Sequence, residues 1–140
     1  MDKMHPALVA EYHRWVEKLS PEEPGVHGIT VKRVLQAHFL IADYFAEDDA
    51  NPMAFAGPRD LNLLHSAVAR QHVSLGGQAK WPFHYDKLAT LFFGLVKNHA
   101  FHDGNKRTAF LIALDQLVID RKSTRLNSSH VKRSRMPSSA

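Results

Sequence analysis

The sequence contains no cysteine, no long apolar run and no leader-like N-terminus. The absence of cysteine excludes a disulfide framework and a thiolate metal site, and it suits a reducing compartment such as the cytoplasm. No apolar run approaches the roughly 20 residues that a membrane-spanning helix needs. The first residues, with Asp2, His5 and Pro6, lack the basic and then apolar layout of a signal peptide. We therefore expect a cytoplasmic protein with no membrane partner.

Positive charge is concentrated at one end of the chain. The 140 residues carry 18 Lys and Arg against 14 Asp and Glu, a formal net charge of +4. Residues 120–140 hold six of the cations and one of the acids, so residues 1–119 hold 12 cations and 13 acids. Strong basicity would favour a nucleic-acid partner, but a Ser, Lys and Arg tail without aromatic residues is typical of a disordered segment. We therefore expect no nucleic-acid partner.

The length predicts one domain with enough apolar residues for a core. We divide the chain into an N-terminal helix and linker over 1–26, a main domain over 27–119 and a disordered basic tail over 120–140. Most of the tail resembles the translation of a common sequencing adapter, so we interpret it as an assembly artefact. A native basic tail that binds a partner is the alternative. If the tail is an assembly artefact, the native sequence stops near Ile119 and the domain is C-terminally truncated.

The densest chemistry lies between His99 and Ala109, where the chain runs His-Ala-Phe-His-Asp-Gly-Asn-Lys-Arg-Thr-Ala. An apolar pattern of helical spacing follows, so a helix is expected to begin at the Gly104-Asn105 turn. A helix N-terminus offers unpaired N–H groups and a partial positive charge, and a glycine there lets the backbone close on an anion. The two cationic side chains that follow add charge at the same point. The run predicts a phosphate-binding site.

Two further side chains of this run suit phosphoryl transfer. Asp103, directly before the turn, is a hard oxygen ligand that can hold Mg²⁺ against phosphate oxygens. His99 lies one helical turn upstream, and an imidazole can take a proton from an attacking hydroxyl near neutral pH. In phosphoryl transfer, positioning and charge neutralisation do most of the catalysis. These residue types together indicate that reaction class.

The run closely resembles the active-site loop of the Fic/Doc family, written H-x-F-x-D/E-G-N-x-R, and in particular the Doc-like (death-on-curing) branch, H-P-F-x-D-G-N-K-R-T-A. The one departure is Ala100, where Pro is usual. A second segment, Gly57-Pro58-Arg59-Asp60 with the apolar residues after it, resembles the Doc-like G-x-R-D-x-x-x-L-x-x-A pattern. The resemblance therefore extends well beyond the loop, and Arg59 is expected either to hold the turn by a salt bridge, which we favour, or to bind substrate.

The resemblance implies a role for each residue of the loop. His99 would deprotonate the target hydroxyl, Asp103 would hold Mg²⁺, and Phe101 would anchor the loop in the core. The resemblance implies that the nucleotide is bound by the turn and the first residues of the helix. The backbone of Gly104, Asn105 and Lys106 would form an anion hole, and Asn105 and Arg107 would hold phosphates.

The resemblance also separates two activities. Fic proteins that transfer AMP generally carry a small residue after the Asn and a second Arg three residues beyond the first, whereas this chain has Lys106 and Phe110 there. In the Doc branch the Lys is associated with an inverted nucleotide pose that transfers the γ-phosphate. The resemblance thus implies a toxin that uses ATP and Mg²⁺ to phosphorylate a Ser or Thr hydroxyl of a protein, elongation factor Tu by family resemblance. AMP transfer to a protein hydroxyl is the alternative.

Three other interpretations were compared with this one. The dipeptide His102-Asp103 also occurs in metal phosphohydrolases, but the further His and Asp ligands of that fold cannot be placed. An ordinary helix cap does not explain the joint spacing of His99, Phe101 and Asp103. A non-catalytic remnant that holds nucleotide or antitoxin without turnover stays open. Because Pro24 stands where an internal inhibitory motif starting at Ser20 needs Glu, any inhibitor is expected to be a separate Phd-type antitoxin.

Helical periodicity predicts an all-α Fic/Doc-type bundle with a short β-hairpin flap, which in this family aligns the target by strand addition. His38 is expected to be a core histidine, Tyr85 to lie on a buried helix side, and Trp81 and Phe83 to be either core or flap residues. The expected helices are 5–19, one capped by Thr30 and ending near Phe45, one capped by Asp60 and ending near Gln71, 84–98, and Asn105 to about Ile119. The expected hairpin lies within Ser74–Phe83.

Overall fold

In this computed structural model, helices make up most of the chain. The structure describes residues 4–21, 28–47, 53 and 55–135, with the backbone alone for 120 and 122–135. The elements in order are α1 (Pro6–Glu17), α2 (Val31–Phe45), α3 (Leu61–Ala69), a 3₁₀ turn η1 (Arg70–His72), β1 (Ser74–Leu75), β2 (Gln78–Ala79), α4 (His84–Lys97) and α5 (Asn105–Arg135). The predicted all-α class with a short hairpin is confirmed.

Side-chain caps start α2 and α3 where the sequence predicted them. The Thr30 hydroxyl accepts a hydrogen bond from the Arg33 amide at 3.1 Å. The Asp60 carboxylate accepts one from the Asn62 amide at 2.9 Å. Each cap satisfies a backbone donor that the first turn of a helix leaves unpaired. Local chemistry therefore sets where both helices begin.

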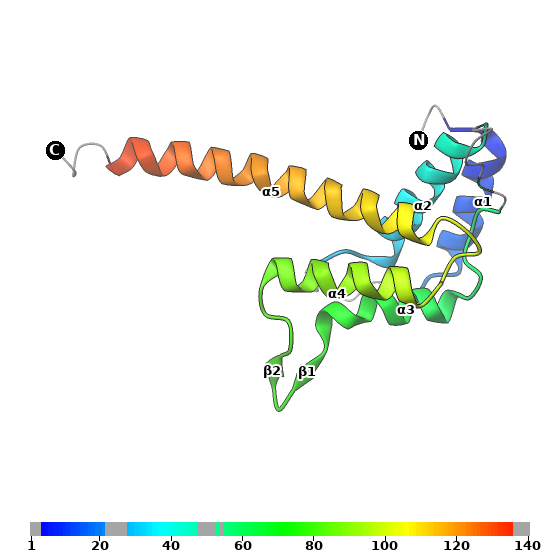
Figure 1. The fold of residues 1–140 in the computed structure, drawn as a ribbon, viewed down its shortest axis with the longest axis horizontal. Coiled ribbons are helices and arrows are strands. Elements are labelled where there is room, and N and C mark those ends of the chain that lie inside the picture. Colours follow the sequence, from blue (N-terminus) through cyan, green and yellow to red (C-terminus); the bar gives the residue numbers. More distant parts are fainter. Residues whose placement is uncertain (1–3, 22–27, 48–52, 54, 136–140) are drawn as a thin grey trace.

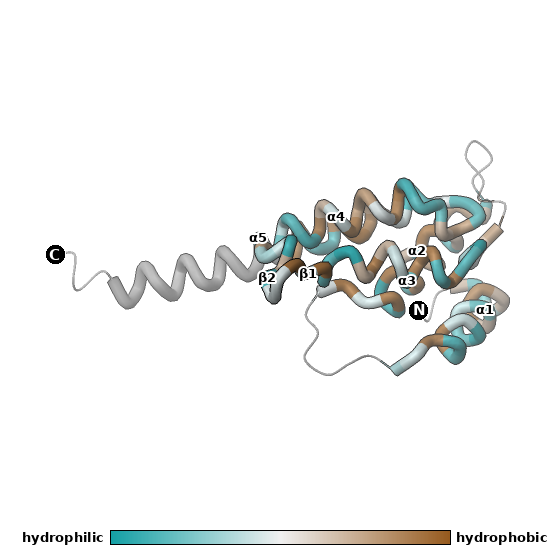
Figure 2. The backbone as a smooth tube through the Cα atoms, turned by 90° about the horizontal axis from the view of Figure 1, so that it is seen from below, coloured by the Kyte–Doolittle hydropathy of each residue, from teal (hydrophilic) through white to brown (hydrophobic). Residues whose placement is uncertain are grey.

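The core lies where α2 and α4 pack on the first half of α5, with α1 over α2 and α3 against α4 (Figure 1). Apolar and hydrophilic residues alternate along these helices, as amphipathic elements require (Figure 2). His38 is fully buried, which confirms the prediction of a core histidine. The largest fully buried apolar side chains are Leu35, Phe39, Leu64, Leu91, Leu95, Phe101 and Ile112.

The hairpin lies between η1 and α4 and extends from the helical body (Figure 1). Ser74 pairs with Ala79 and Leu75 with Gln78, and the two glycines between the strands have positive φ, as a tight hairpin turn requires. Phe83 is exposed and therefore is not a core residue.

The prediction that Tyr85 is buried is wrong, because 59% of the residue is exposed. Tyr85 lies on the stripe of α4 that contains Leu88 and Leu91, but in the first turn of the helix. The buried part of this stripe begins at Leu88. Periodicity identified the correct face without showing where along the helix its packing begins.

The predicted end of the last helix near Ile119 is also wrong, since α5 continues to Arg135 and extends beyond α2 and α4 (Figure 1). No Gly or Pro occurs between Asn105 and Pro137 to stop the helix. A helical backbone over 120–135 differs from the expected disordered tail, while residues 136–140 lie outside the described residues. The adapter interpretation and the division at 119 stay predictions. The expected linker over 22–26 also lies outside the described residues.

α5 carries an exposed apolar row beside its buried face. Thr108, Ala109 and Ile112 are buried. The exposed members of the row are Phe110, Leu114, Leu117, Val118 and Ile119. These side chains form an apolar surface on the outer side of α5. Within the described ranges, no helix is long and apolar enough to cross a membrane.

Candidate functional site

The motif loop, residues 98–104, joins α4 to α5, and its second residue is strained. His99 has φ of +50°, a left-handed conformation that is uncommon outside glycine. Its side chain is exposed and its carbonyl oxygen accepts a hydrogen bond from Arg59 Nε at 3.0 Å. Strained backbone persists only where the surrounding structure holds it. Arg59 therefore supports the His99 backbone through a hydrogen bond to a carbonyl, and among the described residues it forms no salt bridge of the expected kind.

The segment 57–60 lies against the motif loop like a second strand. The amides of Arg59 and Asp60 both donate to the Ala100 carbonyl, at 2.7 and 3.3 Å. Pro58 and Phe101 form an isolated antiparallel bridge. The two segments that carry the family resemblance, 40 residues apart in sequence, are therefore one structural unit.

Phe101 is buried and confirms its predicted structural role. Its ring stacks on the His38 ring, with centroids 3.7 Å apart and an interplanar angle of 7°. His38 Nε2 accepts a hydrogen bond from the Gly57 amide at 2.8 Å, and His38 Nδ1 lies 3.2 Å from the Thr108 hydroxyl. Burial lowers the pKa of His38 to about 3, with the Asp103 carboxylate acting in the opposite direction, so the ring is neutral at physiological pH.

The Asn105 side chain closes the motif loop on itself. Its Oδ1 accepts from the Phe101 amide and its Nδ2 donates to the Phe101 carbonyl, both at 3.0 Å. Sequence reasoning assigned Asn105 to phosphate binding and missed this loop-closing role. The phosphate contact of Asn105 stays a prediction.

The start of α5 has the features expected of an anion site. The first intrahelical hydrogen bond runs from the Thr108 amide to the Gly104 carbonyl at 2.9 Å, so the amides of residues 105–107 precede the helical ladder. Gly104 has φ of +75°, which favours glycine, and a Cβ there would lie 2.8 Å from Met53 Sδ and would displace that side chain. The Gly104 amide donates to Asp103 Oδ1 at 2.7 Å. A phosphate oxygen would have to replace that carboxylate at the amide.

The charged residues beside this turn differ in how they are held. Lys106 is exposed, whereas Arg107 is half-buried and its guanidinium carbon lies 4.2 Å from the centre of the Phe45 ring. A cation over an aromatic face is attracted by the negative charge of that face. Phe45, the last residue of α2, therefore restricts where the Arg107 guanidinium lies.

Asp103 is the residue of this site that suits Mg²⁺. In the described part of the chain no three His, Asp or Glu residues are grouped so as to hold a metal, which is the cluster that a metal phosphohydrolase would need. Mg²⁺ is commonly held by one or two carboxylates together with substrate phosphates. A single carboxylate next to a helix N-terminus fits that arrangement.

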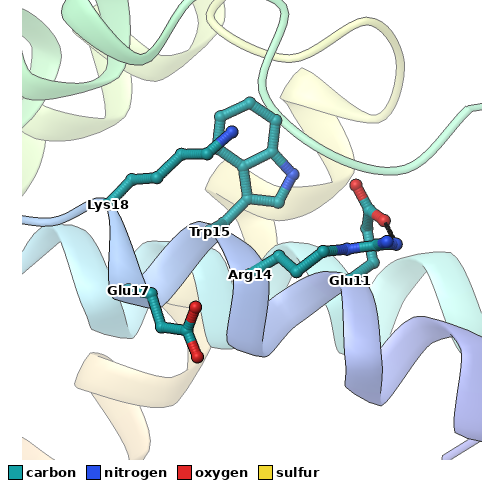
Figure 3. A pocket seen from close by; sticks show the side chains of 5 residues that line it. All are labelled: Glu11, Arg14, Trp15, Glu17 and Lys18. Atoms are coloured by element: carbon teal, nitrogen blue, oxygen red, sulfur yellow. Dashed lines mark hydrogen bonds and ion pairs between the residues drawn. The ribbon is translucent and has the colours of Figure 1, made fainter.

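A separate hollow of about 580 Å³ lies along α1 and is not part of this site. Figure 3 shows that its lining side chains rise from that helix and from Lys18, directly after its last residue. Arg14 pairs with Glu11, and Lys18 lies over the Trp15 ring. The hollow is the charged outer surface of a helix, and its lining contains no residue of the motif loop.

Comparison with known proteins agrees with the site. The model of the Fic/DOC family matches residues 28–117, which include α2, the motif loop and the start of α5. The chain is 40% identical over 86 residues to Toxin Doc of Mycolicibacterium smegmatis, a match that covers 57% of this chain and 66% of that protein. No solved structure is significantly similar to the chain. Because the family match covers most of the chain and includes the whole site, the chain belongs to the Fic/DOC family.

Proposed function

We propose that the chain is a Doc-like toxin that transfers the γ-phosphate of ATP to a Ser or Thr hydroxyl of a protein. The observation that carries the proposal is the motif loop, which contains His99 and Asp103 and leads directly into α5, with the Gly104 amide hydrogen-bonded to the Asp103 carboxylate. A base, a carboxylate and an anion-binding helix end are the groups that phosphoryl transfer needs. The 40% identity to a protein named Toxin Doc supports the Doc-like assignment.

The His99 imidazole takes the proton of the target hydroxyl as the oxygen attacks the γ-phosphorus. The new oxygen–phosphorus bond forms while the bond between the γ-phosphorus and the bridging oxygen breaks, and ADP leaves with those electrons. The amides of Gly104, Asn105 and Lys106 and the cation of Arg107 stabilise the negative charge of the phosphates. Asp103 holds Mg²⁺, which neutralises charge on the phosphate oxygens when bound.

The remaining features of the proposal come from the family resemblance. The protein substrate is elongation factor Tu, the cognate inhibitor is a Phd-type antitoxin, and the site of action is the cytoplasm. The hairpin flap, defined here as residues 74–79, pairs with the extended backbone of the target and aligns its hydroxyl.

Differential labelling tests the reaction. The protein is incubated with elongation factor Tu, or with a bacterial lysate, and with ATP labelled at either the α or the γ phosphate. Label that enters protein only from the γ position supports the proposal. Label only from the α position would instead establish AMP transfer and overturn the kinase assignment.

Expression tests the non-catalytic alternative. Growth of cells that express the natural chain is compared with growth of cells that express His99→Ala. Arrest by the natural chain alone supports an active toxin. Equal growth of the two cultures, with both proteins soluble and able to bind ATP, would favour a remnant that binds nucleotide without turnover.

A further inference from the structure

His38 contacts three separate parts of the site although it lies on α2, 60 residues before the motif loop. A backbone N–H can only donate, so the Gly57 amide fixes Nε2 of His38 as an acceptor. The proton of the neutral ring is then on Nδ1, which faces the Thr108 hydroxyl at 3.2 Å. The ring therefore accepts from the 57–60 segment at one edge and donates to the first turn of α5 at the other.

The face of the same ring supports the motif loop. Phe101 stacks on it at 3.7 Å, and the backbone of Phe101 is held by both ends of the Asn105 amide. Asn105 is the first residue of α5, and Thr108 is in its first turn. The position of the His38 ring therefore affects both ends of the segment that contains Asp103 and Gly104.

No other single side chain readily supplies these contacts. Phe would keep the stacked face but neither hydrogen bond. Gln could place an acceptor near the Gly57 amide, but it has no ring to stack on Phe101. His38 and Thr108 are both fully buried, so water does not replace a lost bond without some opening of the core.

We propose that His38 is a positioning residue for phosphoryl transfer, which sets the motif loop and the start of α5 in their active arrangement through Gly57, Phe101 and Thr108. It does not touch the reacting atoms. The inference rests on the proposed function, because that function gives the motif loop its role in phosphoryl transfer. The contacts by which His38 holds the loop can be tested without measuring phosphoryl transfer.

The kinetic test uses four variants of the full chain. His38→Phe keeps the ring and removes both hydrogen bonds, Thr108→Val removes one partner, and the double variant combines them. We expect His38→Phe to lower kcat per folded molecule about 10²-fold, because displacements of about 1 Å can have that effect. The effects of His38→Phe and Thr108→Val on kcat should be less than additive, since they break one shared contact. His38→Gln should recover part of the lost kcat through the Gly57 amide.

Gln71→Met is the matched control. Gln71 is also a buried polar residue, and its side chain forms three hydrogen bonds, to the Ile29 amide, the Ile29 carbonyl and the Val68 carbonyl. None of these groups belongs to the motif loop. The variant should lower the thermal midpoint as His38→Phe does but leave kcat per folded molecule within about twofold of the wild type.

Amide hydrogen exchange provides the second readout. In His38→Phe we expect exchange at Phe101 and Gly104 to rise about tenfold relative to Gln71→Met, because the variant removes the two hydrogen bonds, to Gly57 and Thr108, that hold the segments on either side of the loop. Equal exchange and equal kcat in the two variants would overturn the proposal and leave His38 as a structural core residue. If the wild type transfers no phosphate while loop exchange still responds only to His38→Phe, the positioning role stands and the proposed function fails.

Discussion

The motif loop and the hairpin flap are both short connections on the same helical body, but they are attached to it very differently. The motif loop is held by hydrogen bonds from the 57–60 segment and from Asn105, and its Phe101 is buried. The four strand residues of the flap are all exposed. The comparison indicates a firmly held region, where we propose that ATP reacts, and a loosely attached one that in the proposed function adapts to the backbone of a protein target.

Among variants of the motif loop, His99→Ala is expected to have the largest effect on kcat. Loss of a general base should lower kcat about 10²- to 10⁴-fold, while the free energy of unfolding changes by at most about 1 kcal/mol because the side chain is exposed. Phosphate transfer and chemical denaturation measure the two quantities. His102→Ala is the control, since this neighbouring imidazole is also exposed. A similar loss of kcat in both variants would contradict the assignment of His99 as the base.

The stability of the firmly held region should depend on pH through His38. Its pKa is lowered to about 3 in the folded chain, against about 6.5 for an unperturbed histidine, because burial disfavours the charged ring. Between these values the unfolded chain binds the extra proton, so stability is fully present above pH 6.5 and is lost as the pH falls towards 3. The loss is at most about 1.4 kcal/mol per pH unit for one group.

Denaturation midpoints measured from pH 7 to pH 4 check this prediction. The decrease should be smaller in His38→Gln, which has no titrating ring at that position. The Asp103 carboxylate partly offsets the effect of burial, so Asp103→Asn should lower the pKa of His38 further and extend the decrease to lower pH without making it steeper. An identical pH profile in the wild type and His38→Gln would contradict a buried neutral imidazole.

A somewhat smaller loss of stability is expected from Asn105→Ala. The substitution leaves the Phe101 amide and carbonyl without their partner, at an expected cost of about 2–3 kcal/mol. Asn98→Ala is a matched control, because that amide donates a single bond of 3.4 Å to the Leu63 carbonyl. Urea denaturation should show less than about 1 kcal/mol for the control. Equal losses would mean that Asn105 does not close the motif loop.

The difference between the two regions also explains which features were predictable from sequence. Caps and turns depend on neighbouring residues, so Thr30, Asp60 and the glycine turn of the hairpin were all located correctly. The run His99–Ala109 likewise predicted that a helix begins at the Gly104-Asn105 turn, and α5 begins at Asn105. These are local features, and local sequence contains them.

The contacts that hold the site depend on residues far apart in the chain. His38 and Thr108 are 70 positions apart, and nothing in either local pattern pairs them. Asn105 was assigned to phosphate by resemblance, while its bonds to Phe101 depend on how sharply the motif loop turns. The burial of a helix position likewise depends on the elements packed around it, and for that reason Tyr85 was wrongly placed in the core.

Ala79→Pro in the hairpin flap is expected to have the smallest effect on stability. It is also the sharpest test of how the flap acts. In this register Leu75 and Gln78 flank the two-residue turn as the hydrogen-bonded pair, and the Lys80 amide donates to the Val73 carbonyl at 2.8 Å. The Ala79 amide therefore points away from the partner strand, where a target backbone could accept from it. Its removal should change the free energy of unfolding by less than about 0.5 kcal/mol.

If the flap aligns the target through its backbone, Ala79→Pro should raise KM for elongation factor Tu about 2- to 10-fold, the value of one net hydrogen bond. KM for ATP should not change, because the nucleotide lies against the start of α5 in the proposed arrangement. Ala79→Val, which keeps the amide and enlarges the side chain, is the control. Equal KM values for the two variants would show that the flap does not use this backbone group, and the contrast between a rigid site and an adaptable one would then require another surface for the target.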